Sequence, residues 1–127
     1  MAIHESGQMY LETIYILSKS GARVRAVDVG ERMGFSKPSV SRALSILKKD
    51  GYVRVEEDGA LTLTERGLAI AETMYTRHTV LTQMLTELGV DETTAARDAC
   101  RIEHVISEKT FDAVRQHLSR MAEKREK

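Results

Sequence analysis

Three residues in the last third of the chain have the types and the spacing of metal ligands. Cys100, Glu103 and His104 stand at positions i, i+3 and i+4, so on a helix their side chains converge on one face. A thiolate, a carboxylate and an imidazole from one helical turn offer three kinds of ligand to a divalent ion. The segment therefore indicates a metal site, provided that other parts of the chain complete it.

Three further residues add donor atoms from other predicted helices. Met9 and Glu12 stand at i and i+3 near the amino terminus, and His78 lies in a long periodic segment. Each residue alone has a plainer explanation. A single Met or Cys more often serves as apolar filling in a core, a single His more often lies at a surface or core edge, and Glu is ordinarily solvated because burial of an unpaired carboxylate is costly.

A second group of residues has the chemistry of DNA recognition. Between positions 32 and 54 the chain carries six basic residues and one acidic residue, a local balance of +5. The six basic residues are Arg32, Lys37, Arg42, Lys48, Lys49 and Arg54. Lysine and arginine side chains on a helix in the major groove reach phosphates and base edges. A solvated helix face is the alternative explanation of such a charge run.

The elements that must position these residues follow from periodicity, caps and turns. We expect a short strand at residues 24–25, and a hairpin whose strands, 52–55 and 61–63, flank the turn 56–60. We expect helices at residues 6–19, 26–33, 36–50, 65–88, 91–106 and 107–121, followed by a frayed end at 122–127. Three helices followed by a two-stranded wing are the order of a winged helix-turn-helix.

The third predicted helix has one apolar face and one polar face. Val40, Leu44 and Leu47 repeat at core spacing, and the opposite side is small, polar and basic. That side comprises Pro38, Ser41, Arg42, Ser45 and Lys49. We expect Arg42 to contact a guanine bidentately, and Ser36 and Ser39 to contact phosphates or bases. The predicted wing tip at 56–58 is acidic, which opposes contact with a phosphate backbone.

Length and composition exclude several classes of protein. The chain has 127 residues, 14.3 kDa, equal numbers of basic and acidic residues, 42% hydrophobic residues and a single Cys. It is too short for a large multidomain enzyme, and one Cys suits a reducing compartment. Because no segment is long and apolar enough to span a membrane, we expect a cytoplasmic protein. An enzyme with Cys100 as nucleophile is disfavoured, since no oxyanion-binding arrangement accompanies it.

Three segments resemble the DtxR/MntR family of metal-dependent transcriptional repressors. They are MYLETIY at 9–15, SKPSVS at 36–41 and, most specifically, ACRIEHVIS at 99–107. The resemblance covers residues 5–118. It implies a mainly α protein with a winged helix-turn-helix DNA-binding domain at 1–72, followed by a helical dimerisation and metal-binding domain at 73–127. We expect a short form, without the SH3-like third domain of longer members.

The resemblance also implies a set of ligands that mixes two branches of the family. Met9, Cys100, Glu103 and His104 match ligands of the iron-responsive branch, whereas Glu12 matches a ligand of the manganese-responsive branch. His78 matches an ancillary-site ligand, but Thr82 and Ala96 stand where that site usually has Glu and His. Because soft sulfur ligands favour Fe(II) over Mn(II) relative to oxygen ligands, we expect Fe(II) as the activator, with Mn(II) as the alternative.

The family's DNA-contacting positions correspond to Ser36, Pro38, Ser39 and Arg42. With the residues beside them, the expected DNA-binding set is Arg32, Ser36, Lys37, Pro38, Ser39, Ser41, Arg42 and Lys48. Surplus apolar surface in the last helices predicts a twofold homodimer on a palindromic operator. We therefore expect a metal-activated repressor of metal-homeostasis genes that uses neither a membrane nor an organic substrate. The alternative is a winged-helix regulator that senses an oxidant or organic ligand through Cys100.

Overall fold

The computed structural model describes residues 3–126, which form six helices and one two-stranded sheet. The chain divides into two compact units, Met1–Thr73 and Met74–Lys127. The predicted mainly α fold, with three helices, a wing and further helices, is confirmed. Among the described residues, no helix is long and apolar enough to cross a membrane.

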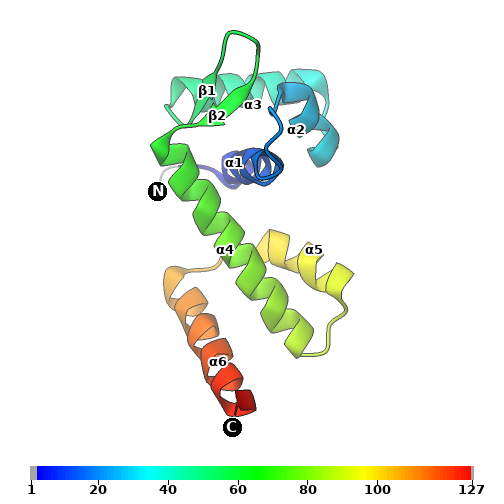
Figure 1. Cartoon of the computed structure of the whole chain (residues 1–127), viewed down its shortest axis with the longest axis vertical. Helices are drawn as coiled ribbons and strands as arrows, with labels where there is room; N and C mark the ends of the chain where they lie inside the picture. The colour runs from blue at the N-terminus through cyan, green and yellow to red at the C-terminus, as the bar shows by residue number, and fades with distance from the viewer. Residues whose placement is uncertain (1–2, 127) are drawn as a thin grey trace. The chain divides into compact units, whose positions relative to one another are not determined.

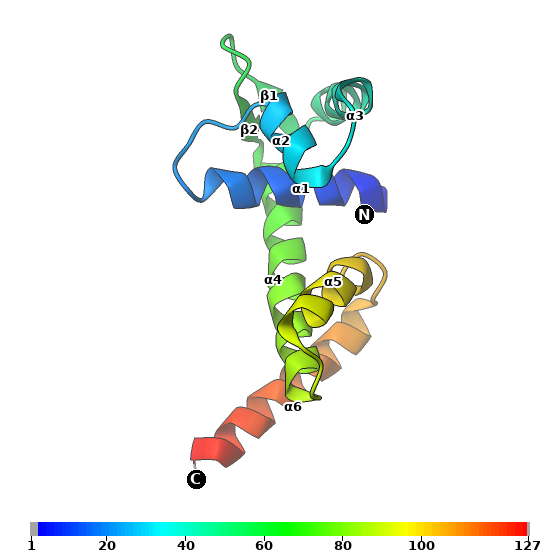
Figure 2. The ribbon, with the colours of Figure 1, turned by 90° about the vertical axis from the view of Figure 1, so that its right-hand side faces the viewer.

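The first unit is a three-helix cluster with a β-hairpin. Helices α2 (Ala26–Met33) and α3 (Lys37–Lys49) pack against each other and against α1 (Glu5–Ser18) (Figures 1 and 2). Strands β1 (Val53–Val55) and β2 (Leu61–Leu63) pair antiparallel, with Val53 opposite Leu63. Their buried side chains form one core, whose members include Leu11, Ile14, Val29, Val40, Leu44, Leu47, Val53 and Leu61.

Local signals define the turn between α2 and α3. Gly34 ends α2 with φ of 72°, a left-handed conformation that glycine adopts without strain. Ser36 then caps α3, because its hydroxyl oxygen accepts a hydrogen bond from the Ser39 amide at 3.4 Å. Pro38 lies in the first turn of α3, where a missing amide hydrogen costs nothing. The predicted positions of both helices are therefore confirmed to within a residue.

The predicted strand at residues 24–25 is wrong. The amide of Leu61 donates to the carbonyl oxygen of Val24 at 2.7 Å, but this single bond is too little to form a strand. The residue before β1 lies against the start of the next helix, since a Cβ at Gly67 would collide with the carbonyl oxygen of Tyr52. Gly67 thus allows close packing between this helix and the chain before β1.

Three helices build the second unit. Helix α4 (Glu65–Glu87) is capped by Thr64 and continues past the boundary at Thr73. Helices α5 (Glu92–Ile102) and α6 (Glu108–Glu126) lie on either side of the second half of α4 (Figure 1). Leu81, Ala99 and Phe111, one from each helix, form the centre of the core.

Two predicted helix ends are wrong, one because of a closed turn in the backbone and one because of a contact with another helix. Helix α5 ends at Ile102 rather than near 106, because the Ile102 carbonyl accepts from the amides of both Val105 and Ile106 and closes a turn. Helix α6 continues to Glu126 instead of fraying from 122. An ion pair of 2.9 Å between Arg125 and Glu87 of α4 holds its last turn. Lys127, in the predicted frayed end, lies outside the described residues.

Candidate metal centre and nucleic-acid interface

The turn that follows α5 gathers a carboxylate and two imidazoles. Nε2 of His104 lies 3.2 Å from Oε1 of Glu103, and Nδ1 of His78 on α4 lies 3.3 Å from Oε2 of the same carboxylate. The sequence placed Glu103 and His104 on the helix itself. The structure instead places them in the turn beyond its end, where they still converge with His78.

Burial distinguishes this cluster from an ordinary surface ion pair. The side chain of Glu103 has no exposed surface, and that of His104 is 3% exposed. A buried carboxylate is costly unless charge or hydrogen bonds compensate it. One carboxylate and two imidazoles are a donor set that a divalent transition-metal ion accepts. The residues of the second unit therefore fit a metal site in chemistry and in position.

Arg77 holds the backbone of this turn. Its Nη1 donates to the carbonyl oxygens of Glu103 and Ile106, both at 3.1 Å. Arg77 precedes His78 on α4, so consecutive residues contact the backbone and the side chain of Glu103. Both the backbone and a side chain of the turn therefore contact α4.

The other predicted ligands lie on separate elements. Cys100 is half-buried in the last turn of α5. Met9 and Glu12 lie on α1 in the first unit, where Glu12 is buried rather than solvated. Thr82 stands one turn after His78 and donates its hydroxyl hydrogen to the His78 carbonyl oxygen at 2.7 Å. The Thr82 hydroxyl is therefore engaged with the helix backbone, and the position offers no carboxylate for an ancillary site.

The polar side of α3 is exposed, as the pattern predicts. Val40, Leu44 and Leu47 are buried, whereas Arg42 and Lys48 are exposed. Most of the predicted DNA-binding residues are exposed, namely Arg32, Ser36, Lys37, Pro38, Ser41, Arg42 and Lys48, and Ser39 is half-buried. Arg32 lies in the last turn of α2, and the others lie on α3 or at its cap.

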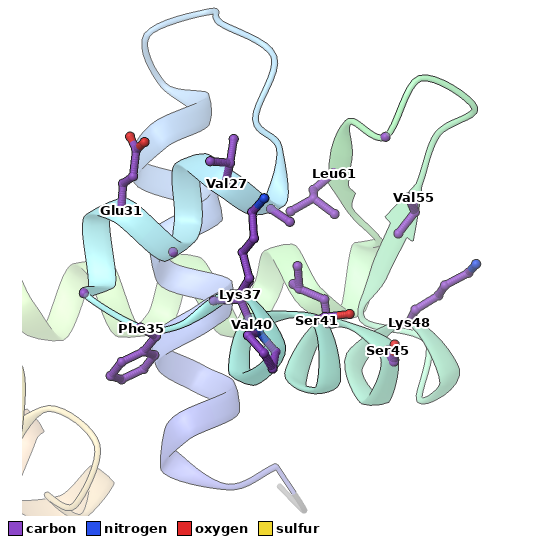
Figure 3. Close-up of a pocket in the computed structure, with 16 residues that line it drawn as sticks. Val27, Glu31, Phe35, Lys37, Val40, Ser41, Ser45, Lys48, Val55 and Leu61 are labelled. Carbon is purple, nitrogen blue, oxygen red and sulfur yellow. The ribbon is translucent and has the colours of Figure 1, made fainter.

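A hollow of about 770 Å³ opens between α2, α3 and the wing (Figure 3). Lys37, Ser41, Ser45 and Lys48 line it along one side of α3, and Val55 of β1 faces them. Lysine and serine side chains are common contacts of DNA phosphates. Since each helical residue turns by about 100°, Arg42 lies on the next face round, outside this lining.

One acidic side chain of the wing tip, Asp58, is paired with two arginines of the chain before α2. Arg23 pairs with Asp58 at 2.8 Å, and Arg25 pairs with the same carboxylate at 3.5 Å. Hydrogen bonding to Arg23, the largest effect, and to the Ala60 amide lowers the pKa of Asp58 below its ordinary value. We call these three residues, Arg23, Arg25 and Asp58, the wing clasp. It places two positive charges beside the Asp58 carboxylate, which opposes the repulsion that the sequence implied at this residue.

Sequence reasoning missed the roles of Arg77 and of the wing clasp. Of these, only Arg77 could have been noticed in the sequence, because it is the immediate neighbour of the candidate ligand His78. Arg23 and Asp58 are separated by 35 positions, and no local pattern connects them. Both interactions join segments that meet only in the folded chain.

Two domain families match almost the whole chain. Residues 2–61 match "Iron dependent repressor, N-terminal DNA binding domain". Residues 64–126 match "Iron dependent repressor, metal binding and dimerisation domain". The boundary between the two matches, at residues 62–63, falls within β2, just before α4.

Individual relatives agree with these matches. The iron-dependent repressor IdeR of Mycobacterium tuberculosis is 36% identical over 105 residues, which cover 82% of this chain and 46% of the relative. The diphtheria toxin repressor of Corynebacterium diphtheriae is 33% identical over the same shares. The chain thus spans less than half the length of these curated relatives. An uncharacterized HTH-type regulator of Methanocaldococcus jannaschii is 29% identical and is covered over 98% of its length.

Solved structures show the same fold. A manganese-dependent transcriptional repressor in complex with manganese superposes with a TM-score of 0.83 at 30% identity, over 89% of this chain and 52% of the other. The manganese regulator SloR gives a TM-score of 0.79 at 22% identity, over 94% and 55%. With both domains matched in order, the chain belongs to the DtxR/MntR family of metal-dependent transcriptional repressors.

Proposed function

We propose that this chain is a metal-activated repressor that binds a palindromic operator in metal-homeostasis genes. The observation that carries the proposal is the convergence of partly exposed His78 with the buried side chains of Glu103 and His104, in the unit that follows a winged helix-turn-helix. A buried carboxylate between two imidazoles has its clearest use as a ligand set. The names of the iron- and manganese-dependent relatives support the same function.

The proposed ligands are Met9, Glu12, His78, Cys100, Glu103 and His104. When bound, the ion would supply positive charge that compensates the carboxylates and that the neutral imidazole and thioether donors can coordinate. Thioether and thiolate sulfur favour Fe(II), and the carboxylates of Glu12 and Glu103 keep Mn(II) as an alternative. The proposed domain limits are 1–72 for DNA binding and 73–127 for metal binding and dimerisation.

DNA recognition is proposed to use α3 and its surroundings. Arg42 reads a guanine through its two-pronged guanidinium group, and Ser36, Pro38 and Ser39 approach the bases or backbone at the start of the helix. Lys37, Lys48, Arg32 and Ser41 contact phosphates, which position the helix without reading sequence. The operator is double-stranded DNA, so the proposed compartment is the cytoplasm.

Activation is proposed to be a population shift between arrangements of the two units. Met9 and Glu12 belong to α1, whereas the other ligands belong to the second unit. Ligands from both units that share one ion favour the arrangement that binds DNA. A preference of about 2–3 kcal/mol per protomer raises operator affinity by about one to two orders of magnitude for each coupled site.

A homodimer is proposed because the second unit exposes large apolar side chains. Val105 is 66% exposed in the turn after α5, and Leu88 is 69% exposed in the turn after α4. Association of two copies would cover such surface. Two recognition helices would then meet successive major grooves, about 34–36 Å apart or a multiple of it.

The test is an anaerobic fluorescence-anisotropy titration of the protein against DNA from its own upstream region, with Fe(II), Mn(II) or chelator. Operator binding should require the metal, with Fe(II) effective at lower free concentration than Mn(II). Cys100→Ala and Met9→Ala should weaken activation by Fe(II) more than activation by Mn(II). Operator binding that persists in chelator and disappears with peroxide would contradict the proposal and favour an oxidant sensor.

A further inference from the structure

Arg77 makes a contact that the proposed ligand set does not explain. Its Nη1 donates two hydrogen bonds, to the carbonyl oxygens of Glu103 and Ile106, each at 3.1 Å. These carbonyls flank His104, whose side chain is almost fully buried. One side chain of α4 therefore closes the backbone segment that carries two of the proposed ligands.

The end of α5 needs such a donor. Helix α5 stops at Ile102, and the carbonyl oxygens beyond a helix end have no partner within that helix. The Ile102 carbonyl already accepts from Val105 and Ile106, which folds the chain back before α6 begins. Arg77 supplies donors to two carbonyls in this reversal, so its removal takes away two hydrogen bonds between α4 and the backbone of the turn.

Arg77 is itself held in place. Its guanidinium carbon lies 5.5 Å from the ring centroid of Phe111, a buried member of the core of the second unit. Cations over aromatic rings are stabilised by the charge distribution of the ring. A planar guanidinium that faces a ring and donates to two carbonyls has little rotational freedom.

The contact of Arg77 with the Glu103 carbonyl gains functional importance from the next residue along α4. His78, the next residue, places Nδ1 3.3 Å from the carboxylate of Glu103. Residues 77 and 78 thus contact the two ends of Glu103, its carbonyl oxygen and its carboxylate. The direction of that carboxylate depends on both contacts.

We propose that Arg77 is a positioning residue that orients Glu103 and His104 for metal binding. This inference rests on the proposed function, since it concerns the same site. Arg77 itself donates no ligand, because a guanidinium carries no lone pair for a cation. Groups that orient ligands typically contribute a factor of about 10–100 to metal affinity.

The test compares Arg77→Met, Arg77→Lys and the wild-type chain. Methionine retains much of the aliphatic length and removes every donor, whereas lysine retains the charge. Co(II) is the probe, since its visible absorption reports both affinity and ligand geometry. Competition with a chelator should show about a tenfold to hundredfold loss for Arg77→Met, a smaller loss for Arg77→Lys, and an altered Co(II) spectrum for Arg77→Met.

Arg115→Met is the matched control. Arg115 lies over the same ring of Phe111, at 5.9 Å, from an exposed position on α6. Its substitution removes the same charge and a similar ring contact but leaves both carbonyl bonds in place. We expect this variant to bind Co(II) with wild-type affinity and spectrum.

Amide hydrogen exchange separates positioning from general stability. In the apo protein, Arg77→Met should raise exchange in residues 103–106 more than in α5. Wild-type Co(II) affinity and spectrum in folded Arg77→Met would overturn the inference and leave the proposed function intact. If Arg77→Met does not fold, Arg77→Lys decides in the same way. A wild-type chain that binds none of Co(II), Fe(II) and Mn(II) would overturn both.

Discussion

The surface of α3 and the turn after α5 place their polar side chains in different environments. The polar side chains of α3 are exposed and point away from a core that its other face completes. In the turn after α5, charged and polar side chains are buried, and their positions depend on contacts with α4. Changes on α3 should therefore alter what is bound with little effect on the fold, whereas changes in the turn should affect the site as a whole.

The largest expected effect is at the buried carboxylate. Glu103→Gln preserves shape and removes the negative charge between the two imidazoles, so it should lower Mn(II) and Co(II) affinity by at least about a hundredfold. Equilibrium dialysis of the apo protein measures this. Glu108→Gln, at an exposed position on α6, is the control and should bind normally. Affinity within threefold of wild type for Glu103→Gln would remove Glu103 from the ligand set.

On α3, the largest expected effect concerns base preference. Arg42→Ala should cost about 1–3 kcal/mol at one base position, because a bidentate contact to guanine is lost. Metal affinity should not change. The measurement is metal-activated binding to an operator and to its single-base variants.

Lys48→Ala sharpens that test, because a phosphate contact carries no sequence information. It should weaken operator and scrambled DNA equally and reduce the slope of log affinity against log salt by about 1. Equal base preference in wild type and Arg42→Ala would refute the assignment of Arg42.

A smaller effect is expected at the wing clasp. Asp58→Asn removes one negative charge and releases Arg23 and Arg25, so binding to non-operator DNA should increase about threefold to tenfold at low salt. Glu57→Gln is the matched control, because it removes an equal charge at the wing tip without breaking the clasp. Equal increases in the two variants would mean that net charge alone matters and that the release of the arginines does not.

The smallest effect is the pH dependence of the clasp. The pKa of Asp58 in the folded chain is below its ordinary value, chiefly because Arg23 donates to its carboxylate. Its contribution to stability is thus complete above the unfolded value of about 3.9 and disappears as pH falls through the lower folded value. Carboxyl NMR titration should show the lowered pKa, and Arg23→Gln should return it towards the ordinary value.

The sequence predicted what depends on neighbours along the chain. Helix α2 and the start of α3 were located because Gly34, Ser36 and Pro38 act within one turn of their own positions. The hairpin was located for the same reason. The end of α5 was not, because it depends on the closed turn after Ile102 and on Arg77, far away in sequence.

For the site, residue types were easier to predict than environments. Glu103 and His104 were identified from spacing, yet a glutamate is ordinarily solvated, and only packing reveals that Glu103 is fully buried. In the sequence, Asp58 of the acidic wing tip opposes DNA binding, whereas in the structure its carboxylate is paired with two arginines. Both differences arise from contacts between distant segments, which periodicity does not report.

The adjacency of Arg77 and His78 also limits how this protein can evolve. These neighbours contact opposite ends of Glu103, and a helix turns by about 100° for each residue. A codon inserted or deleted in α4 between these residues and the core residue Leu81 would rotate both away from the turn after α5 while that core stayed in place. Lineages that carry this site should therefore diverge in α4 by substitution alone and accept changes of length only in the loops.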